Sequence, residues 1–280
     1  MLKSRQIATG ICLTGTFSEH ILNINAPIHY KRSLSMRIRS FIAIFVSVGL
    51  IGCGGSDAVK EVVEQTHPNG SKKKVSYYQG KHIVRTAFFF EDGKLRSDQY
   101  FKLGQPDSCQ VIYNQDGSKY SEKWFKAGKQ DGPDREWYEN GQLKSEATYV
   151  DGLTQGKAVT YFKDGKIETE CTYKDGKKHG EEIKYFPSGN KKYLKTYVDG
   201  DASGIEQEWY ENGKLKMEQT WAKNVLNGPY TTYFKNGKKE EEGFYKDGAY
   251  EGIRKMYNDK GKKLSEAKFE KGVLVDGTAY

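Results

Sequence analysis

The sequence repeats itself with a constant 24-residue period. The segments Tyr161–Gly165, Tyr185–Gly189, Trp209–Gly213 and Tyr233–Gly237 read YFKDG, YFPSG, WYENG and YFKNG, and each starts one period after the one before. A further WYENG occupies Trp137–Gly141, three periods ahead of its second copy. A fixed period of this size is typical of arrays in which each unit packs against its neighbours. Any single motif therefore has to be interpreted first as part of the array.

Glycines and aromatic residues keep the same period. Most of the 31 glycines fall into three columns with 24-residue steps, which run from Gly93 to Gly261, from Gly80 to Gly272 and from Gly132 to Gly252. The second column is interrupted only by Asn224, and asparagine tolerates a left-handed backbone better than most residues. These glycines therefore indicate turns rather than a phosphate-binding loop. The first aromatic column is Tyr77, Phe101, Phe125, Tyr149, Tyr173, Tyr197, Trp221, Tyr245 and Phe269, and the second aromatic column is Phe89, Tyr113, Trp137, Tyr161, Tyr185, Trp209, Tyr233 and Tyr257.

Each unit is expected to be a pair of antiparallel strands. Lys157–Gly180 reads KAVTYFKDGKIETECTYKDGKKHG, in which two stretches rich in Thr, Tyr, Val, Ile and Phe are each followed by Asp-Gly. Asp-Gly and Asn-Gly supply the positive φ values of tight hairpin turns, and no segment carries a helical period. The sequence predicts an all-β fold, an elongated single-layer antiparallel β-meander of about nine 24-residue hairpins over residues 67–280. Since 36% of the residues are hydrophobic, we expect a thin and largely solvated sheet.

Side-chain alternation assigns the aromatic columns to faces of this sheet. A two-residue loop at the Asn-Gly of the first WYENG would place Tyr138 opposite Leu143 on one face, with Trp137 on the other face beside Lys144 and Glu146. A loop one residue longer would break this assignment. With the shorter loop, part of the second aromatic column forms a row on the more polar face. The row is either ordinary sheet packing or a ligand surface, and its candidate residues are Trp137, Tyr161, Tyr185, Trp209 and Tyr233.

The unit resembles the MORN repeat, in the variant form found in bacteria. The pattern Y-F-x-[DN]-G-K-x-x-x-E-x-x-Y-x-D-G-K-x-x-G covers about three quarters of the chain and recurs clearly at least six times. The resemblance implies an elongated antiparallel sheet used as a scaffold or binding surface, and some bacterial members are described as antitoxin-like. Classical MORN units carry a Gly-x-Gly where this chain has Gly180 alone. The phosphoinositide or membrane binding of classical members is therefore not carried over.

The segment ahead of the array has the layout of a bacterial lipoprotein signal. Two arginines precede an apolar run from Phe41 to Ile51, which is shorter than the roughly 20 residues of a transmembrane helix. Leu50–Cys53 reads LIGC and resembles the lipobox, which implies that Cys53 receives a diacylglyceryl group and becomes the new N-terminus. The alternative is a cysteine that happens to follow an ordinary secretory signal. Gly54, directly after this cysteine, resembles a signal for outer-membrane sorting.

The signal divides the chain into four segments. Residues 1–35 precede a complete signal and are interpreted as an over-long start assignment, with translation expected from Met36. Residues 36–52 are the expected signal peptide, 53–66 the acylated cysteine and a polar tether, and 67–280 the array. The expected location is the bacterial cell envelope, lipid-anchored in the outer membrane.

Charge and titratable residues argue against several functions. Residues up to Gly52 hold six of the 45 basic and one of the 37 acidic residues, so the formal charge of +8 falls to +3 without them. Lysine and glutamate are mixed along the strands, which indicates solvated faces rather than a nucleic-acid site. The array's three histidines lie in different phases of different units, and no spacing fits a metal site, a nucleophile elbow or a phosphate loop. We therefore expect no enzyme activity, cofactor or metal. Cys109 and Cys171, more than two units apart, are expected to be semi-buried and not disulfide-bonded to each other.

These observations lead to one preferred function and three alternatives. The preferred hypothesis is a lipid-anchored envelope protein that binds or scaffolds a protein partner, with the membrane reached through Cys53. The first alternative is an immunity or antitoxin-like protein that neutralises a toxin at the envelope. The second is glycan binding along the aromatic row, since aromatic side chains bury a large area with few rotatable bonds. An envelope enzyme is the least favoured hypothesis.

Overall fold

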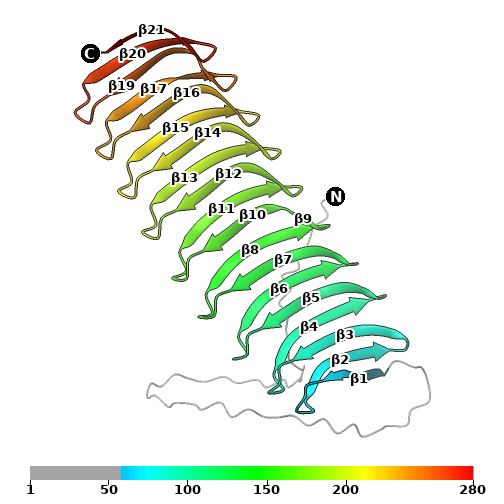
Figure 1. Cartoon of the computed structure of the whole chain (residues 1–280). Coiled ribbons are helices and arrows are strands. Elements are labelled where there is room, and N and C mark those ends of the chain that lie inside the picture. Colours follow the sequence, from blue (N-terminus) through cyan, green and yellow to red (C-terminus); the bar gives the residue numbers. More distant parts are fainter. Residues whose placement is uncertain (1–57, 280) are drawn as a thin grey trace, which may run out of the picture. The chain divides into compact units, whose positions relative to one another are not determined.

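A computed structural model describes residues 58–279, which form one antiparallel sheet of 21 strands without a helix (Figure 1). Successive strand positions pair in sequence order, so the sheet is a meander. The predicted all-β, single-layer fold is confirmed. The predicted start at Met36, the signal peptide and the lipid-attachment residue Cys53 lie outside the described residues.

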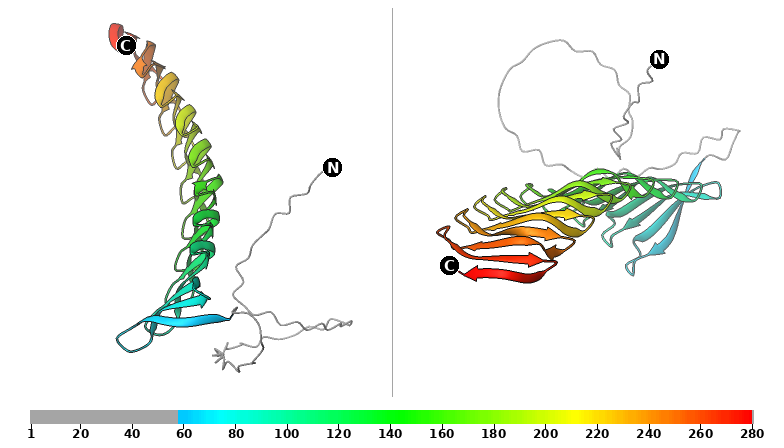
Figure 2. Two further views of the ribbon diagram at one scale, coloured as in Figure 1. Left: turned by 90° about the vertical axis from the view of Figure 1, so that its right-hand side faces the viewer. Right: turned by 90° about the horizontal axis from the view of Figure 1, so that it is seen from above.

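The strands follow one another at regular intervals. They are β1 (Val59–Thr66), β2 (Lys72–Gln79), β3 (His82–Phe89), β4 (Leu95–Lys102), β5 (Gln105–Tyr113), β6 (Lys119–Lys126), β7 (Lys129–Trp137), β8 (Leu143–Val150), β9 (Leu153–Thr154), β10 (Gly156–Tyr161), β11 (Ile167–Lys174), β12 (Lys177–Tyr185), β13 (Lys191–Val198), β14 (Asp201–Trp209), β15 (Leu215–Ala222), β16 (Val225–Tyr233), β17 (Lys239–Lys246), β18 (Ala249–Tyr250), β19 (Gly252–Tyr257), β20 (Lys263–Glu270) and β21 (Val273–Ala279). β9 and β10 together pair with β8, and β18 and β19 together pair with β17, so each couple occupies one strand position. Two further views show the sheet as a single, twisted layer (Figure 2).

The sheet begins earlier than the expected start of the array at residue 67. The segment Val59–Thr66, which the sequence placed in the tether, is strand β1 and pairs with β2, with Val63 opposite Val75. Three valines within VKEVVEQT give this segment enough β-propensity to join the sheet. Any tether in this region is therefore shorter than residues 53–66.

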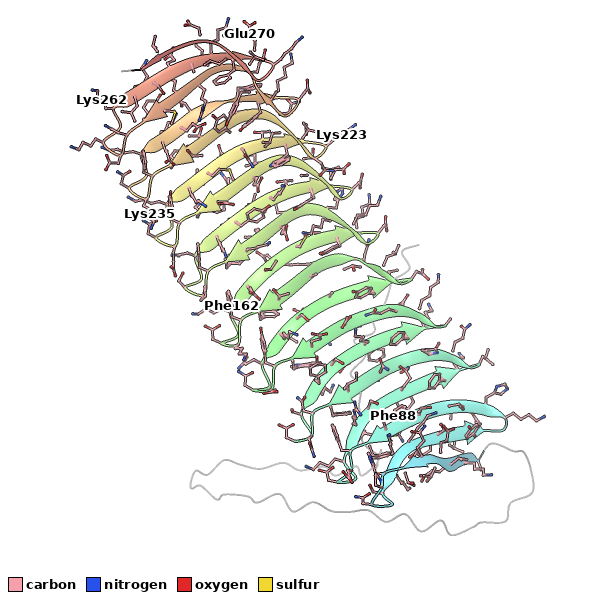
Figure 3. The ribbon with its side chains drawn as sticks, in the orientation of Figure 1. Phe88, Phe162, Lys223, Lys235, Lys262 and Glu270 are labelled. Atoms are coloured by element: carbon pink, nitrogen blue, oxygen red, sulfur yellow. The ribbon has the colours of Figure 1, made fainter. Side chains whose placement is uncertain are left out.

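The two long edges of the sheet carry different turns. On one edge, Asp175 and Gly176 form a two-residue loop with φ values of 50° and 77°, and Lys174 lies opposite Lys177. Positive φ at both positions is the signature of the type I′ turn predicted for Asp-Gly. Figure 3 shows Lys223, which belongs to another turn of this kind, on the edge opposite Phe162, Lys235 and Lys262.

The other edge carries three-residue loops, so the two-residue loop predicted at WYENG is wrong. The N–H of Gly141 donates to the carbonyl of Tyr138 at 2.9 Å, and the N–H of Tyr138 donates to the carbonyl of Gln142 at 2.9 Å. These bonds, with a φ of 82° at Gly141, define a type I turn closed by a left-handed glycine. Trp137 consequently lies opposite Leu143, and Tyr138 does not.

A bulge beside this loop places Leu143, and not Lys144 as predicted, on the face of Trp137. Glu136 lies opposite Ser145, which leaves Lys144 as the additional residue of its strand. Leu143 therefore shares the face of Trp137, while the Lys144 ammonium forms an ion pair with Glu136 at 3.1 Å on the opposite face.

Two faces can be followed along the array, because directly opposed residues share a face. Face A is defined by the ladder Asp98, Val111, Glu122, Arg135, Glu146, Val159, Glu170, Ile183 and Leu194, in which each residue lies opposite the next. Face B is the other side, defined by the ladder Asp134, Ala147, then Ala158, Cys171, Glu182, Lys195 and Glu206.

The face that carries the buried carboxylates changes along the sheet. The buried carboxylates of the N-terminal part, Asp98 and Glu122, lie on face A, whereas the later ones, Glu182 and Glu206, lie on face B. No thick core exists among the described residues, and only short side chains such as Val75 and Ala87 are fully enclosed. Both array cysteines are buried, and Cys171 is a free thiol, so no disulfide joins it to Cys109.

Candidate interaction surface

The five predicted site residues lie on one face. Tyr161 and Val159 alternate on β10, and Val159 belongs to the ladder of face A. The same alternation places Trp137, Tyr185, Trp209 and Tyr233 on face A. All five side chains are partly exposed. The predicted row therefore exists as an arrangement of rings, each separated from the next by two strands.

Two tyrosines of the row, Tyr161 and Tyr185, are fixed by carboxylates of the same face. The Tyr161 hydroxyl donates to Glu146 Oε1 at 2.8 Å, and the Tyr185 hydroxyl donates to Glu170 Oε1 at 2.6 Å. Burial and these bonds to anionic acceptors raise the pKa of Tyr161 and of Tyr185 to about 12. The hydroxyl groups are thus occupied, and the ring faces are what these residues offer to a ligand.

The tryptophans of the row are flanked by lysines. The Lys119 ammonium lies 5.6 Å from the ring centroid of Trp137, and the Lys191 ammonium lies 5.9 Å from that of Trp209. Such cation–π contacts contribute on the order of 0.5–1 kcal/mol at exposed sites. Close ring contacts occur instead on face B, where the centroids of Tyr245 and Tyr250 are 4.6 Å apart. The row is therefore a series of separate anchors with charged groups between them.

Face B is held together by tyrosine, carboxylate and arginine groups. The Arg254 guanidinium donates to both carboxylate oxygens of Glu241, at 2.7 and 2.9 Å, and the Tyr230 hydroxyl donates to the same carboxylate. Burial alone would raise the pKa of Glu241, but the bonds from Arg254 and Tyr230 outweigh it and lower the pKa below its ordinary value. Because these groups satisfy one another, the cluster is structural and offers no free acid or base.

Two open pockets lie at the two WYENG loops. One pocket of about 560 Å³ is lined by Trp137, Tyr138 and Lys144 among others, and one of about 620 Å³ by Trp209, Tyr210 and Lys216. The sequence interpretation missed Tyr138 and Tyr210, because the assumed two-residue loop gave the aromatic residue of the turn no role. The signal was present in the sequence, since these two turns alone among residues 130–247 carry tyrosine where neighbouring turns carry phenylalanine.

Five windows of the chain match the family model described as "MORN repeat variant": 130–151, 154–175, 178–199, 202–223 and 226–247. Residues 130–247 thus carry five consecutive matches to the MORN repeat variant. Each MORN window contains one hairpin with a three-residue loop, as in β7–β8. Each window also contains one residue of the predicted row, in the order Trp137, Tyr161, Tyr185, Trp209 and Tyr233. The row is thus a regular feature of the MORN unit.

The hairpin geometry continues beyond the matched MORN windows. At the loop between β19 and β20, the N–H of Gly261 donates to the carbonyl of Asn258 at 2.8 Å, the same turn as at Gly141. Among solved structures, a chain in "Crystal Structure of TcdB2-TccC3-Cdc42" is 10% identical, and the match covers 76% of this chain and 16% of that chain with a TM-score of 0.19. No curated protein matches the chain.

Residues 58–279 contain no cluster of three or more His, Cys, Asp or Glu side chains able to hold a metal ion. In that range the structure also has no helix with the length and apolar character needed to cross a membrane. What the array presents is an extended, rigid surface of repeated aromatic and charged groups.

Proposed function

We propose that the array is a protein-binding or scaffold module, and that its partner lies along face A across the row of the second aromatic column. The observation that carries this proposal is the placement of five partly exposed aromatic rings, one per MORN window, on a single face of one continuous sheet. Aromatic anchors contribute most of the affinity in many protein interfaces because they bury a large area at low entropic cost. The hydroxyl bonds of Tyr161 to Glu146 and of Tyr185 to Glu170 hold these two rings in place before a partner binds.

We also propose that Cys53 anchors the module in the envelope of a bacterium. The support is the lipobox-like LIGC after an apolar run. Several acyl chains would give stable anchoring, at about 0.8 kcal/mol per buried CH₂. Globomycin, which blocks lipoprotein signal cleavage, is expected to cause the longer precursor to accumulate, and Cys53→Ala should abolish acylation. A mature protein that still carries residues 1–35 would contradict the signal assignment.

Partner capture tests the binding row. The full-length protein would be cross-linked in cells, purified, and its bound proteins identified by mass spectrometry. The double variant Trp137→Ala and Trp209→Ala should reduce capture at least tenfold, since aromatic anchors cost about 2 kcal/mol or more when truncated. Tyr161→Ala with Tyr185→Ala should have the same effect, because these residues are confined to the row.

A matched control removes aromatic rings without touching the row. Phe162 and Phe234 follow row residues directly, so alternation places them on face B, and they are separated by three repeat units, as the two tryptophans are. Their double alanine variant should retain capture. Far-UV circular dichroism must be unchanged in all variants. Undiminished capture by both row variants would remove the row from the proposal, a toxin as the captured protein would favour the antitoxin-like alternative, and enrichment of glycan alone would favour glycan binding.

A further inference from the structure

The two WYENG regions are more alike than the repeat requires. Glu136–Glu146 and Glu208–Glu218 differ at only two positions, Gln142 against Lys214 and Ser145 against Met217. The two units between them diverge in the same stretch and carry Phe162 and Phe186 at the turn. Because those units form the same hairpin with other residues, the shared side chains of the two WYENG regions are not needed for the fold alone.

Both WYENG loops are tied to the next unit by the same bonds. The Tyr138 hydroxyl donates to the carbonyl of Tyr161 at 2.7 Å, and Asn140 Nδ2 donates to the carbonyl of Lys163 at 2.9 Å. The phenylalanine at the equivalent turn positions could not make the first bond. The second copy repeats the pattern, from Tyr210 to the carbonyl of Tyr233 at 2.7 Å and from Asn212 to the carbonyl of Lys235 at 3.1 Å. These contacts hold the aromatic wall of each pocket in place.

The pockets beside the two loops are equivalent. Apart from Asn140, every residue that lines the first pocket has its counterpart three repeat units later in the second. The lining pairs are Asn114 and Phe186, Tyr120 and Lys192, Trp137 and Trp209, Tyr138 and Tyr210, Glu139 and Glu211, Lys144 and Lys216, and Lys163 and Lys235. A ligand group that fits one pocket is therefore expected to fit the other.

The side chains of the pockets favour a ligand that carries an acidic group next to an aromatic or aliphatic group. In the first pocket, Lys144 is paired with Glu136 at 3.1 Å, which leaves Lys163, exposed at the tip of the following loop, beside the single acidic lining residue Glu139. The second pocket is lined by four lysines and two acids, and its Lys216 is likewise paired with Glu208 at 2.9 Å, so in each pocket the lysine of the following loop, Lys163 or Lys235, is available for an anion. The Asn140 amide and the Tyr138 hydroxyl are occupied by the fold. A neutral sugar, which needs several free donors and acceptors, is less well served than a carboxylate.

The spacing of the pockets defines the ligand further. Three units correspond to six strand positions, which at about 4.8 Å each is about 29 Å before twist. An extended peptide spans that distance in about nine residues. We propose that the two WYENG pockets together bind a polypeptide that carries two acidic anchors about nine extended residues apart. This inference rests on the proposed protein-binding function, and its pockets lie at the loop edge, where they share only Trp137 and Trp209 with the row.

Oligoproline rulers test this spacing directly. Synthetic peptides would carry Asp-Phe-Asp at both ends of 3, 9 or 15 prolines, which span about 9, 28 and 47 Å. Titration of the full-length protein by calorimetry should give the tightest binding for the nine-proline peptide. A ligand that reaches both sites binds about 100-fold or more tightly than one with a single anchor. A twin peptide with Asn-Phe-Asn ends should bind at least tenfold more weakly.

Charge reversal identifies the pockets. The double variant Lys163→Glu and Lys235→Glu should lose the preference for nine prolines and at least tenfold in affinity. Lys174→Glu with Lys246→Glu is the control, because these exposed lysines have the same three-unit separation but flank turns of the opposite edge. Binding that ignores spacer length, an equal effect of both lysine pairs, or binding of a β-linked N-acetylglucosamine oligomer in place of the acidic peptides would overturn the inference. None of these results would affect the test of the row by Tyr161→Ala with Tyr185→Ala, because neither tyrosine lines a WYENG pocket.

Discussion

Two glycines of the same column should respond very differently to alanine. At Gly228, φ is 136°, and an added Cβ would lie 2.8 Å from the Thr220 Cβ. At Gly252, φ is 77°, and an added Cβ would meet nothing within 4 Å. Gly252→Ala should therefore cost only the left-handed backbone penalty of about 1–2 kcal/mol. Gly228→Ala adds a backbone conformation rarely open to alanine, at about 1–3 kcal/mol, and an overlap that costs about 1–3 kcal/mol more.

The expected total for Gly228→Ala is about 2–6 kcal/mol, against about 1–2 kcal/mol for Gly252→Ala. Since a repeat array need not unfold in one step, amide hydrogen exchange of the flanking strands is the appropriate measurement. A cost of about 3 kcal/mol corresponds to exchange faster by about 150-fold in β16 and β17, whereas about 1 kcal/mol corresponds to about fivefold near Gly252.

A second-site change separates overlap from backbone strain. In the Gly228→Ala background, Thr220→Gly removes the Cβ that the new methyl group would meet, and it should restore part of the lost protection. Thr220→Ala keeps that Cβ and should restore little. Similar losses at Gly228 and Gly252, or equal rescue by both changes at Thr220, would refute the reasoning from close approach.

Three further perturbations follow from the contacts. Tyr138→Phe and Tyr210→Phe should each lower local stability by about 1 kcal/mol, measured by hydrogen exchange of the neighbouring amides. The two losses should add, because the loops lie about 29 Å apart. A strongly non-additive double variant would contradict independent loops. Because the pKa of Glu241 is lowered in the folded protein, its ionised form stabilises the fold fully above the ordinary carboxyl pKa, and this contribution is lost as pH falls from the ordinary pKa through the lowered one. Glu241→Gln, measured by acid denaturation, should flatten this dependence and should destabilise the fold at neutral pH, because Arg254 loses its anionic partner. Every turn equivalent to that of Asn224 has glycine, yet Asn224→Gly should lower stability by about 1 kcal/mol, because the Asn224 side chain accepts a hydrogen bond from the Ala202 N–H at 2.7 Å. A variant that is more stable in thermal unfolding would show that relief of the left-handed backbone outweighs the lost hydrogen bond.

Much of the fold was predictable because the same local backbone preferences recur in every unit. Alternating β-formers separated by Asp-Gly or Asn-Gly gave the strands, and the fixed period gave the meander. The assumed hairpin pairing also placed Trp137 on the face of Glu146, and this holds because the bulge at Lys144 compensates for the longer loop. What failed was the loop beside it, since Asn-Gly fits both a two-residue turn and a type I turn closed by glycine. That single residue exchanged the faces of Leu143 and Lys144.

A shift at the start of the sheet was also outside the reach of the repeat pattern. Tyr77 lies opposite Arg85, which in turn lies opposite Tyr100, so these three share face A. Phe101, the next member of the first aromatic column, is adjacent to Tyr100 and therefore points to face B. Periodicity alone assigns Tyr77 and Phe101 to one face, because it cannot register a one-residue change in strand pairing.

The sequence by itself determined the period, the strands, the glycine turns and the alignment of the second aromatic column. These follow from preferences that act within a few residues, and they do not depend on how one unit meets the next. The tertiary structure alone decided which carboxylates are buried, which loop tyrosines bond to the following unit, and that the two WYENG loops form equivalent pockets. Those features arise from contacts between residues about one unit apart, such as Tyr138 and the carbonyl of Tyr161, and such contacts exist only when the units are stacked in register.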